Sequence, residues 1–237
     1  MKGGRIMKRW LVAIAVILIT VQSLAQDKDK DKDKAKDQGG RFVYADFEQL
    51  KDGRPVSTRG GLVLLTGYQQ NPANAVSFTN SDKPWPQSPM VAPAAQNHSQ
   101  FIAFNFTIPA PNQWAGVALE IRGMPDKDGK QVAEDLSAYG YLSVQAIAQG
   151  TTSLKAELIS KDNGLNIADG EQFGFVFKLS PGFNTYRLKL KDFYQPTWVE
   201  NRKSLKDVLK FLTAVHFVTQ EVPSKGQVVI DNVVFEK

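Results

Sequence analysis

Eleven short runs of alternating apolar and polar residues constrain the fold more than any other feature of this sequence. In the run at 100–108, Ile102, Phe104, Phe106 and Ile108 form one face, and more polar residues form the other. Successive strand residues point to opposite faces, so each run predicts a strand with one buried face. The runs lie at 41–48, 60–68, 74–80, 100–108, 113–123, 139–149, 153–160, 173–179, 184–193, 213–220 and 227–235. Many short strands separated by Gly, Pro, Asn and Asp predict an all-β fold, an antiparallel β-sandwich.

One segment predicts a helix instead. The sequence SLKDVLKFL at 204–212 has helical spacing of its apolar residues. Ser204 stands at the N-cap position, and Asp207 stands where a capping box has its acidic residue. We therefore expect one short helix near 204–212 in an otherwise all-β domain.

The first 25 residues predict a signal peptide. Basic residues precede an eleven-residue apolar run, Leu11–Val21, and small residues follow at 23–25. The apolar run is too short to span a membrane, which takes roughly 17–25 residues. We therefore expect cleavage before Gln26, a secreted or periplasmic protein, and no membrane span after cleavage.

Residues 26–40 predict a disordered linker because Asp and Lys alternate there with almost no apolar residues. Removing residues 1–25 leaves 25 basic against 24 acidic residues, a net charge of about +1. This balance disfavours nucleic acid as a partner. The chain has no Cys, so a β-sandwich domain at 41–237 must be stabilised by its core rather than by disulfides.

Two segments between the strands predict irregular structure. The first, at 81–99, is rich in Pro and carries Trp85, which predicts a loop. The second, at 123–140, begins with a turn at Asp128–Gly129, and its Asp-x-Asp-Gly fragment lacks the further ligands of a calcium-binding EF-hand loop. We expect both segments to be surface loops.

The usual catalytic motifs are missing from the sequence. There is no nucleophile elbow, no His-Glu-x-x-His and no phosphate-binding loop. The chain has only two histidines, His98 and His216, which leaves little for a histidine-based triad or metal cluster. These absences favour a protein that is not an enzyme.

Three carboxylates near the two ends of the sandwich indicate a structural calcium site. Asp46 and Glu48 are two residues apart, so they share one face of a strand, and Asp231 interrupts the apolar run at 227–235. If the first and last strands are neighbours, these carboxylates converge, and Ca²⁺ favours such oxygen ligands. The alternative is that Asp231 pairs with Arg41 or Arg59, or accepts hydrogen bonds from a loop.

One sheet face combines aromatic and polar residues. If the strands around 113–123, 139–149, 153–160 and 213–220 share a sheet, its outer face has the composition of a sugar-binding surface. The residues concerned are Trp114, Glu120, Arg122, Tyr141, Gln145, Glu157 and His216. The alternatives are an ordinary solvated face and a glycosidase pair formed by Glu120 and Glu157.

Four strings in this order resemble carbohydrate-binding module family 11 and the complex I intermediate-associated protein 30 family. They are YADFEQL, EDLSAYGYLSVQAIAQGTTSLKAELIS, NTYRLKLKDF with SLKDVLKFLTAVHF, and GQVVIDNVVF. The resemblance implies a galactose-binding-like jelly roll without catalytic machinery. It also implies a calcium ion at Asp46 or Glu48 and Asp231, and a glycan held by Trp114 and Tyr141.

We therefore hypothesise an exported, non-catalytic carbohydrate-binding module whose partner is a polysaccharide or other glycan. The alternative is a structural or protein-interaction β-sandwich of the cell envelope, with an envelope protein as its partner. A third hypothesis is a glycan-cleaving enzyme.

Overall fold

All eleven predicted strands are present in the computed structural model, which describes residues 40–70, 76–78, 101–122, 133–160, 165, 167–220 and 223–237. A short hairpin of β2 (Leu50–Lys51) and β3 (Arg54–Pro55) was not predicted. The strands that match the predicted runs are β1 (Arg41–Ala45), β4 (Leu62–Gln69), β5 (Val76–Phe78), β6 (Ile102–Ile108), β7 (Ala115–Arg122), β8 (Tyr141–Gln149), β9 (Ser153–Ile159), β10 (Phe173–Lys178), β11 (Asn184–Lys189), β12 (Ala214–Thr219) and β13 (Ser224–Glu236).

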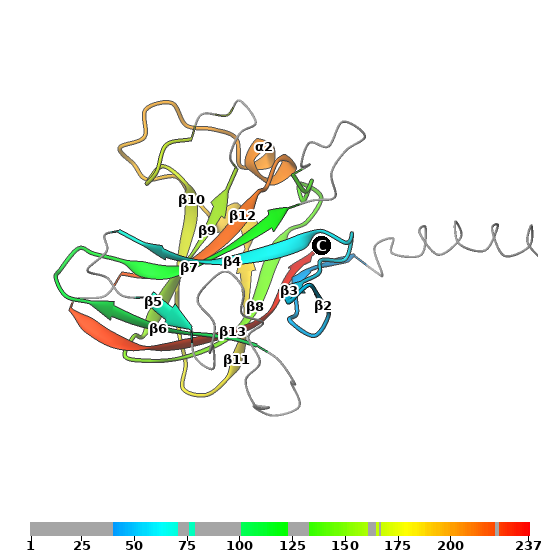
Figure 1. The fold of residues 1–237 in the computed structure, drawn as a ribbon. Coiled ribbons are helices and arrows are strands. Elements are labelled where there is room, and N and C mark those ends of the chain that lie inside the picture. The colour runs from blue at the N-terminus through cyan, green and yellow to red at the C-terminus, as the bar shows by residue number, and fades with distance from the viewer. Residues whose placement is uncertain are drawn as a thin grey trace, which may run out of the picture. The chain divides into compact units, whose positions relative to one another are not determined.

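The strands form two antiparallel sheets that face each other (Figure 1). We call one the β13 sheet; its order is β11-β8-β13-β6-β5, with β1 also paired to β13. We call the other the β12 sheet; its order is β10-β9-β12-β7-β4. This arrangement confirms the predicted antiparallel jelly-roll sandwich.

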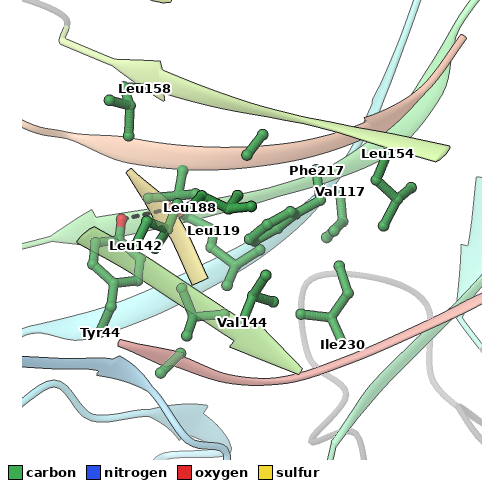
Figure 2. Close-up of a cluster of buried hydrophobic side chains, with 14 of the residues drawn as sticks. Tyr44, Val117, Leu119, Leu142, Val144, Leu154, Leu158, Leu188, Phe217 and Ile230 are labelled. Carbon is green, nitrogen blue, oxygen red and sulfur yellow. Dashed lines mark hydrogen bonds between the residues drawn. The ribbon is translucent and has the colours of Figure 1, made fainter. Parts of the chain in front are cut away.

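Side chains from both sheets meet in one hydrophobic core. Figure 2 shows Val117, Leu119 and Phe217 of the β12 sheet pointing toward Val144 and Ile230 of the β13 sheet. The alternation predicted for β7 is confirmed, because its residues 115, 117, 119 and 121 belong to the core between the sheets, whereas Ala118 is buried but does not belong to that core.

The Tyr44 hydroxyl links the two sheets through the core. It donates a hydrogen bond to the Leu119 carbonyl oxygen at 2.7 Å and accepts one from the Ile121 N–H at 3.1 Å (Figure 2 shows the first). Burial raises the pKa of Tyr44, so the hydroxyl keeps its proton and stays a donor.

Asp231 and Asn232 lie in a β-bulge of β13. Asp231 is opposite Gln145 of β8, but the register then shifts so that Val234 is opposite Ser143. Asn232 has a φ of 48°, in the left-handed region that Asn tolerates better than most residues. The bulge resets the alternation, so both halves of β13 present apolar residues to the core. This explains how two adjacent polar residues fit in a buried strand.

The predicted helix is present as α2 (Leu205–Lys210), and a 3-10 helix, η1 (Leu190–Asp192), follows β11. Ser204 is the N-cap of α2, but its side chain makes no capping hydrogen bond. Its carbonyl oxygen instead accepts the N–H groups of Asp207 and Val208, and Val208 is buried. The helix therefore forms mainly because its apolar side packs on the domain.

Several predictions concern segments outside the described residues. These are the signal peptide at 1–25, nearly all of the linker at 26–40, the Pro-rich loop at 81–99 and the turn at Asp128–Gly129. Within the described residues, no helix has the length and hydrophobicity needed to cross a membrane.

Candidate functional site

A groove of about 510 Å³ lies on the outer face of the β12 sheet. The inward residues Val117 and Phe217 pack in the core, so their neighbours along β7 and β12 face outward. On β7 these outward neighbours include Gly116 and Ala118, which have small side chains or none. A Cβ at Gly116 would come within 2.1 Å of the Phe217 carbonyl oxygen, so the close approach of β12 requires glycine there.

Aromatic rings from β4 and from the residue just before β7 form one wall of this groove. The Tyr68 ring lies with its centroid 4.3 Å from that of Trp114 and 4.1 Å from that of His216 on β12. Tyr68 belongs to β4, so its side chain reaches across the low surface of Gly116 and Ala118 to meet β12. The small residues of β7 thereby allow an aromatic cluster to form over the sheet.

Trp198 contributes an aromatic ring from the loop that precedes α2. Its side chain lines the groove, is 62% exposed and lies above Gly170, where a Cβ would be 3.7 Å from the indole. The buried side chain of Gln195 holds this loop in place: its Nε2 donates to the Glu171 carbonyl at 2.8 Å, and its Oε1 accepts from the Lys203 N–H at 2.6 Å. Trp198 is thus an exposed ring on an anchored loop.

Lys155 and Glu157 supply charge between the aromatic groups. They are two residues apart on β9, so both face outward, and Lys155 Nζ lies 2.8 Å from Glu157 Oε1. Glu157 is only 7% exposed, and His216 Nδ1 lies 3.8 Å from its Oε2. Burial raises the pKa of Glu157, but the neighbouring His216 and Lys155 outweigh it and hold the pKa below its ordinary value. Glu157 is therefore an ionised acceptor at neutral pH.

Further polar groups complete the groove. Burial, together with the negative charges of Glu157 and Asp169, raises the pKa of Tyr68, so its hydroxyl is a donor. The buried Gln172 accepts the Gly170 N–H at 2.7 Å and thereby holds the turn that carries Asp169. His216 contacts Tyr68 and Glu157 but does not itself line the groove, and its buried Nδ1 atom has no hydrogen-bond partner among the described residues. The groove thus contains ionised groups, donors and acceptors beside its aromatic rings.

The structure brings together three of the predicted site residues, Trp114, Glu157 and His216. Glu120 is on the same sheet, opposite Leu64 and Ala214, but does not line the groove. The backbone of Arg122 pairs with Leu62 at the end of β7, and its side chain is outside the described part of the structure.

The placement predicted for Tyr141 and Gln145 is wrong. Both belong to β8, which lies in the β13 sheet and not beside β7. The Tyr141 ring is covered by the Arg187 guanidinium, whose Cζ is 3.4 Å from the ring centroid, and Gln145 Oε1 accepts a hydrogen bond from Asn232 Nδ2. Strands β7 and β8 show the same alternation of apolar and polar residues. That alternation predicts a strand but does not specify which strands pair.

Most groove residues were not predicted, among them Tyr68, Asp169, Gln172 and Trp198. Tyr68 could have been found, because the alternation of β4 places it on the same face as Leu64 and Thr66, opposite to the buried Val63 and Leu65. The other three lie in loops, which carry no periodic signal.

The predicted meeting of the first and last strands is confirmed, because β1 pairs with β13 up to Ala45 and Val233. The three-carboxylate metal site is not formed by the described residues, among which no three acidic, His or Cys side chains gather. Asp46 Oδ1 accepts the Glu48 N–H at 3.1 Å, and Asp231 Oδ1 accepts the Asn232 N–H at 2.7 Å. Calcium binding therefore stays a prediction.

The two arginines considered as partners for Asp231 pair elsewhere. Arg59 Nη1 lies 2.7 Å from Glu134 Oε2, and Arg41 Nε lies 3.6 Å from Glu236 Oε1. Asp231 is completely buried and accepts hydrogen bonds from both the backbone and the side chain of Asn232. Its carboxylate therefore stabilises the bulge.

We expect Asp231→Ala to lower the free energy of unfolding by about 1–3 kcal/mol, because it leaves the partly buried N–H donors of Asn232 without their acceptor. Asp231→Asn keeps one acceptor oxygen and should cost less. Urea unfolding would be measured in calcium and in a chelator. Equal losses in both conditions would support the bulge role, whereas a loss confined to calcium would support a metal at Asp231.

This geometry defines a class of protein: an antiparallel β-sandwich with a groove of aromatic and polar residues on the outer face of one sheet. No protein-family model matches the chain, and no curated protein matches it. The family 11 carbohydrate-binding module of a cellulosomal cellulase of Clostridium thermocellum has a similar structure, with a TM-score of 0.53, 15% identity, and coverage of 84% of this chain and 96% of that one.

A family 11 module from Clostridium thermocellum in complex with a β-1,3-1,4-mixed-linked tetrasaccharide is also similar. Its TM-score is 0.52 at 13% identity, and the match covers 84% of this chain and 97% of that one. The chain therefore has the fold of family 11 carbohydrate-binding modules, which confirms the structural resemblance inferred from the sequence.

Proposed function

We propose that this protein is a non-catalytic carbohydrate-binding module that binds a glycan in the groove of the β12 sheet. The observation that carries the proposal is the combination of the exposed Trp198 ring, the Tyr68–Trp114 pair and the Lys155–Glu157 ion pair in one groove. Stacking on aromatic rings suits the apolar faces of sugar rings, and sugar hydroxyls can both donate and accept hydrogen bonds.

The groove is built to bind with little rearrangement. The Trp198 loop is anchored by Gln195, and the turn at Asp169 is anchored by Gln172. Groups that are already ordered lose little conformational entropy on binding, so more of the contact energy contributes to affinity. The structure of a family 11 module is known in complex with a tetrasaccharide, which supports a glycan as the ligand here.

The Glu157 carboxylate in the groove favours binding over hydrolysis. A glycosidase needs one carboxyl group with a raised pKa to act as the general acid. Glu157 has the opposite property, because Lys155 and His216 hold its pKa below the ordinary value. Glu120, its predicted catalytic partner, does not line the groove.

The test is isothermal titration with soluble mixed-linked β-glucan, xylan and galactan. We expect at least one to bind the wild-type protein and Trp198→Ala to lower that affinity by about tenfold or more, since an exposed aromatic anchor is lost. Tyr194→Ala is the matched control, because Tyr194 is 59% exposed and does not line the groove.

Binding of no glycan, or an equal loss in both variants, would contradict the proposal.

We also propose export through the segment at 1–25. Cells that express the full chain would be fractionated, and the protein would be recovered from the exported fraction. A mature N-terminus at Gln26 would support that part of the proposal.

A further inference from the structure

A second cleft, of about 630 Å³, lies between the end of β11 with η1 on one side and α2 on the other. Three lysines line it: Lys189 at the end of β11, Lys191 in η1 and Lys206 in α2. Among the described residues that line the cleft, none is acidic. The cleft therefore gathers positive charge from three separate elements.

The amino groups of these lysines are available to a ligand. None of the three makes an ion pair with a described residue, and all three residues are exposed. Asp192 and Asp207 are their neighbours in sequence but do not line the cleft. Like charges held around one concave surface raise the local positive potential, and an anion bound there would relieve the repulsion.

The base of the cleft is fixed by backbone and core contacts. The Leu190 N–H donates to the Gly140 carbonyl at 2.9 Å, and the Leu136 N–H donates to the Leu209 carbonyl at 2.8 Å. Leu190 and Leu209 are buried, so both the η1 side and the α2 side are attached to the core. The elements that carry the lysines are therefore held at a fixed separation.

Hydroxyl groups and a paired arginine complete the surroundings. Ser204 and Tyr141 line the cleft, and the Ser204 side chain is not used to cap α2. Arg187 covers the Tyr141 ring and has its charge matched by Glu236, whose Oε2 lies 2.9 Å from Arg187 Nε. The three lysines, not the arginine, thus supply the uncompensated charge.

We propose that this cleft is a second binding site, for the sulfate or carboxylate groups of an anionic polysaccharide. It differs in chemistry from the groove of the β12 sheet, where Glu157 and Asp169 outnumber Lys155. The net charge of about +1 that remains without residues 1–25 is too small to favour a nucleic acid, whose binding depends on many phosphate contacts. The three lysines of the cleft instead suit a polysaccharide that carries anionic groups at intervals along its length.

The test compares two triple variants of the full chain. Lys189→Gln/Lys191→Gln/Lys206→Gln removes the cleft charge, and Lys51→Gln/Lys178→Gln/Lys225→Gln removes the same charge from exposed lysines that do not line the cleft. Affinity would be measured in 50 mM salt with dextran sulfate, polygalacturonate and uncharged dextran. Dextran sulfate and polygalacturonate distinguish sulfate from carboxylate as the recognised group.

We expect the wild-type protein to bind at least one of the two anionic polymers and not dextran, with affinity that falls as salt is added. The cleft variant should bind about tenfold more weakly, and the control variant should stay within about twofold of wild type. Trp198→Ala should bind the anionic polymer as wild type does, which separates this site from the glycan groove.

Three outcomes would overturn the proposal. The first is binding of neither anionic polymer by the wild-type protein. The second is an equal loss in both triple variants, which would show attraction to overall charge. The third is tighter binding of a single-stranded DNA oligonucleotide than of either polysaccharide, which would assign the cleft to nucleic acid.

Discussion

Phe217→Ala is expected to lower the free energy of unfolding by about 3–5 kcal/mol. Phe217 is completely buried on β12 and packs among Val117, Leu119 and Leu154 between the two sheets (Figure 2). Its removal loses the transfer free energy of the ring and leaves a cavity that two hydrogen-bonded sheets cannot collapse to fill. Urea unfolding followed by tryptophan fluorescence would measure the loss.

Phe211→Ala is the matched control for this prediction. Phe211 follows α2 and is 37% exposed, so the same truncation there should cost about 1 kcal/mol or less. Similar losses at the two positions would mean that the space between the sheets is not the main source of stability.

Lys155→Met is expected to lower the free energy of unfolding by about 3 kcal/mol at pH 7. The substitution keeps most of the apolar stem but removes the ammonium 2.8 Å from the buried Glu157 carboxylate and leaves His216 as its remaining neighbour. Lys178→Met on β10 is the control, because Lys178 is exposed and has no ion pair with a described residue. A loss no larger than that of the control would show that the Lys155–Glu157 pair is not stabilising.

The pH dependence of this effect follows from the lowered pKa of Glu157. A carboxyl group with a lower pKa in the folded than in the unfolded state contributes stability above the unfolded value, about 4.3. That stability is lost as the pH falls through the folded value. The difference in unfolding free energy between wild type and Glu157→Gln should therefore be largest near neutral pH and shrink below about pH 4.

The strands could be predicted from the sequence because their signal is local. Each of the eleven runs contains its own alternation, and the buried faces of β6 and β7 follow from it directly. The hairpin of β2 and β3 has two residues in each strand, too few for any periodicity. The bulge at Asp231 is visible in the sequence only as two adjacent polar residues, and whether they bind a metal or each other depends on the neighbouring strands.

The candidate site could be predicted only in part because it combines distant segments. Trp114, Glu157 and His216 were assigned correctly to one face, since β12 pairs with β7 on one side and with β9 on the other. Tyr141 was assigned to that face as well, but β8 pairs with β11 and β13. Trp198 lies in a loop whose position is set by the Gln195 hydrogen bonds, and no local pattern in the sequence encodes them.

The central position of β13 sets the order in which this domain can be assembled. The strand hydrogen-bonds with β8 on one side and with β6 and β1 on the other, yet it follows every one of them in the chain (Figure 1). Ribosomes release the N-terminal segments first, so β1, β6 and β8 emerge while the strand that joins them has not been made. The β13 sheet therefore closes only after translation has passed residue 236. This delay suits the export proposed here, since folding would be completed on the far side of the membrane.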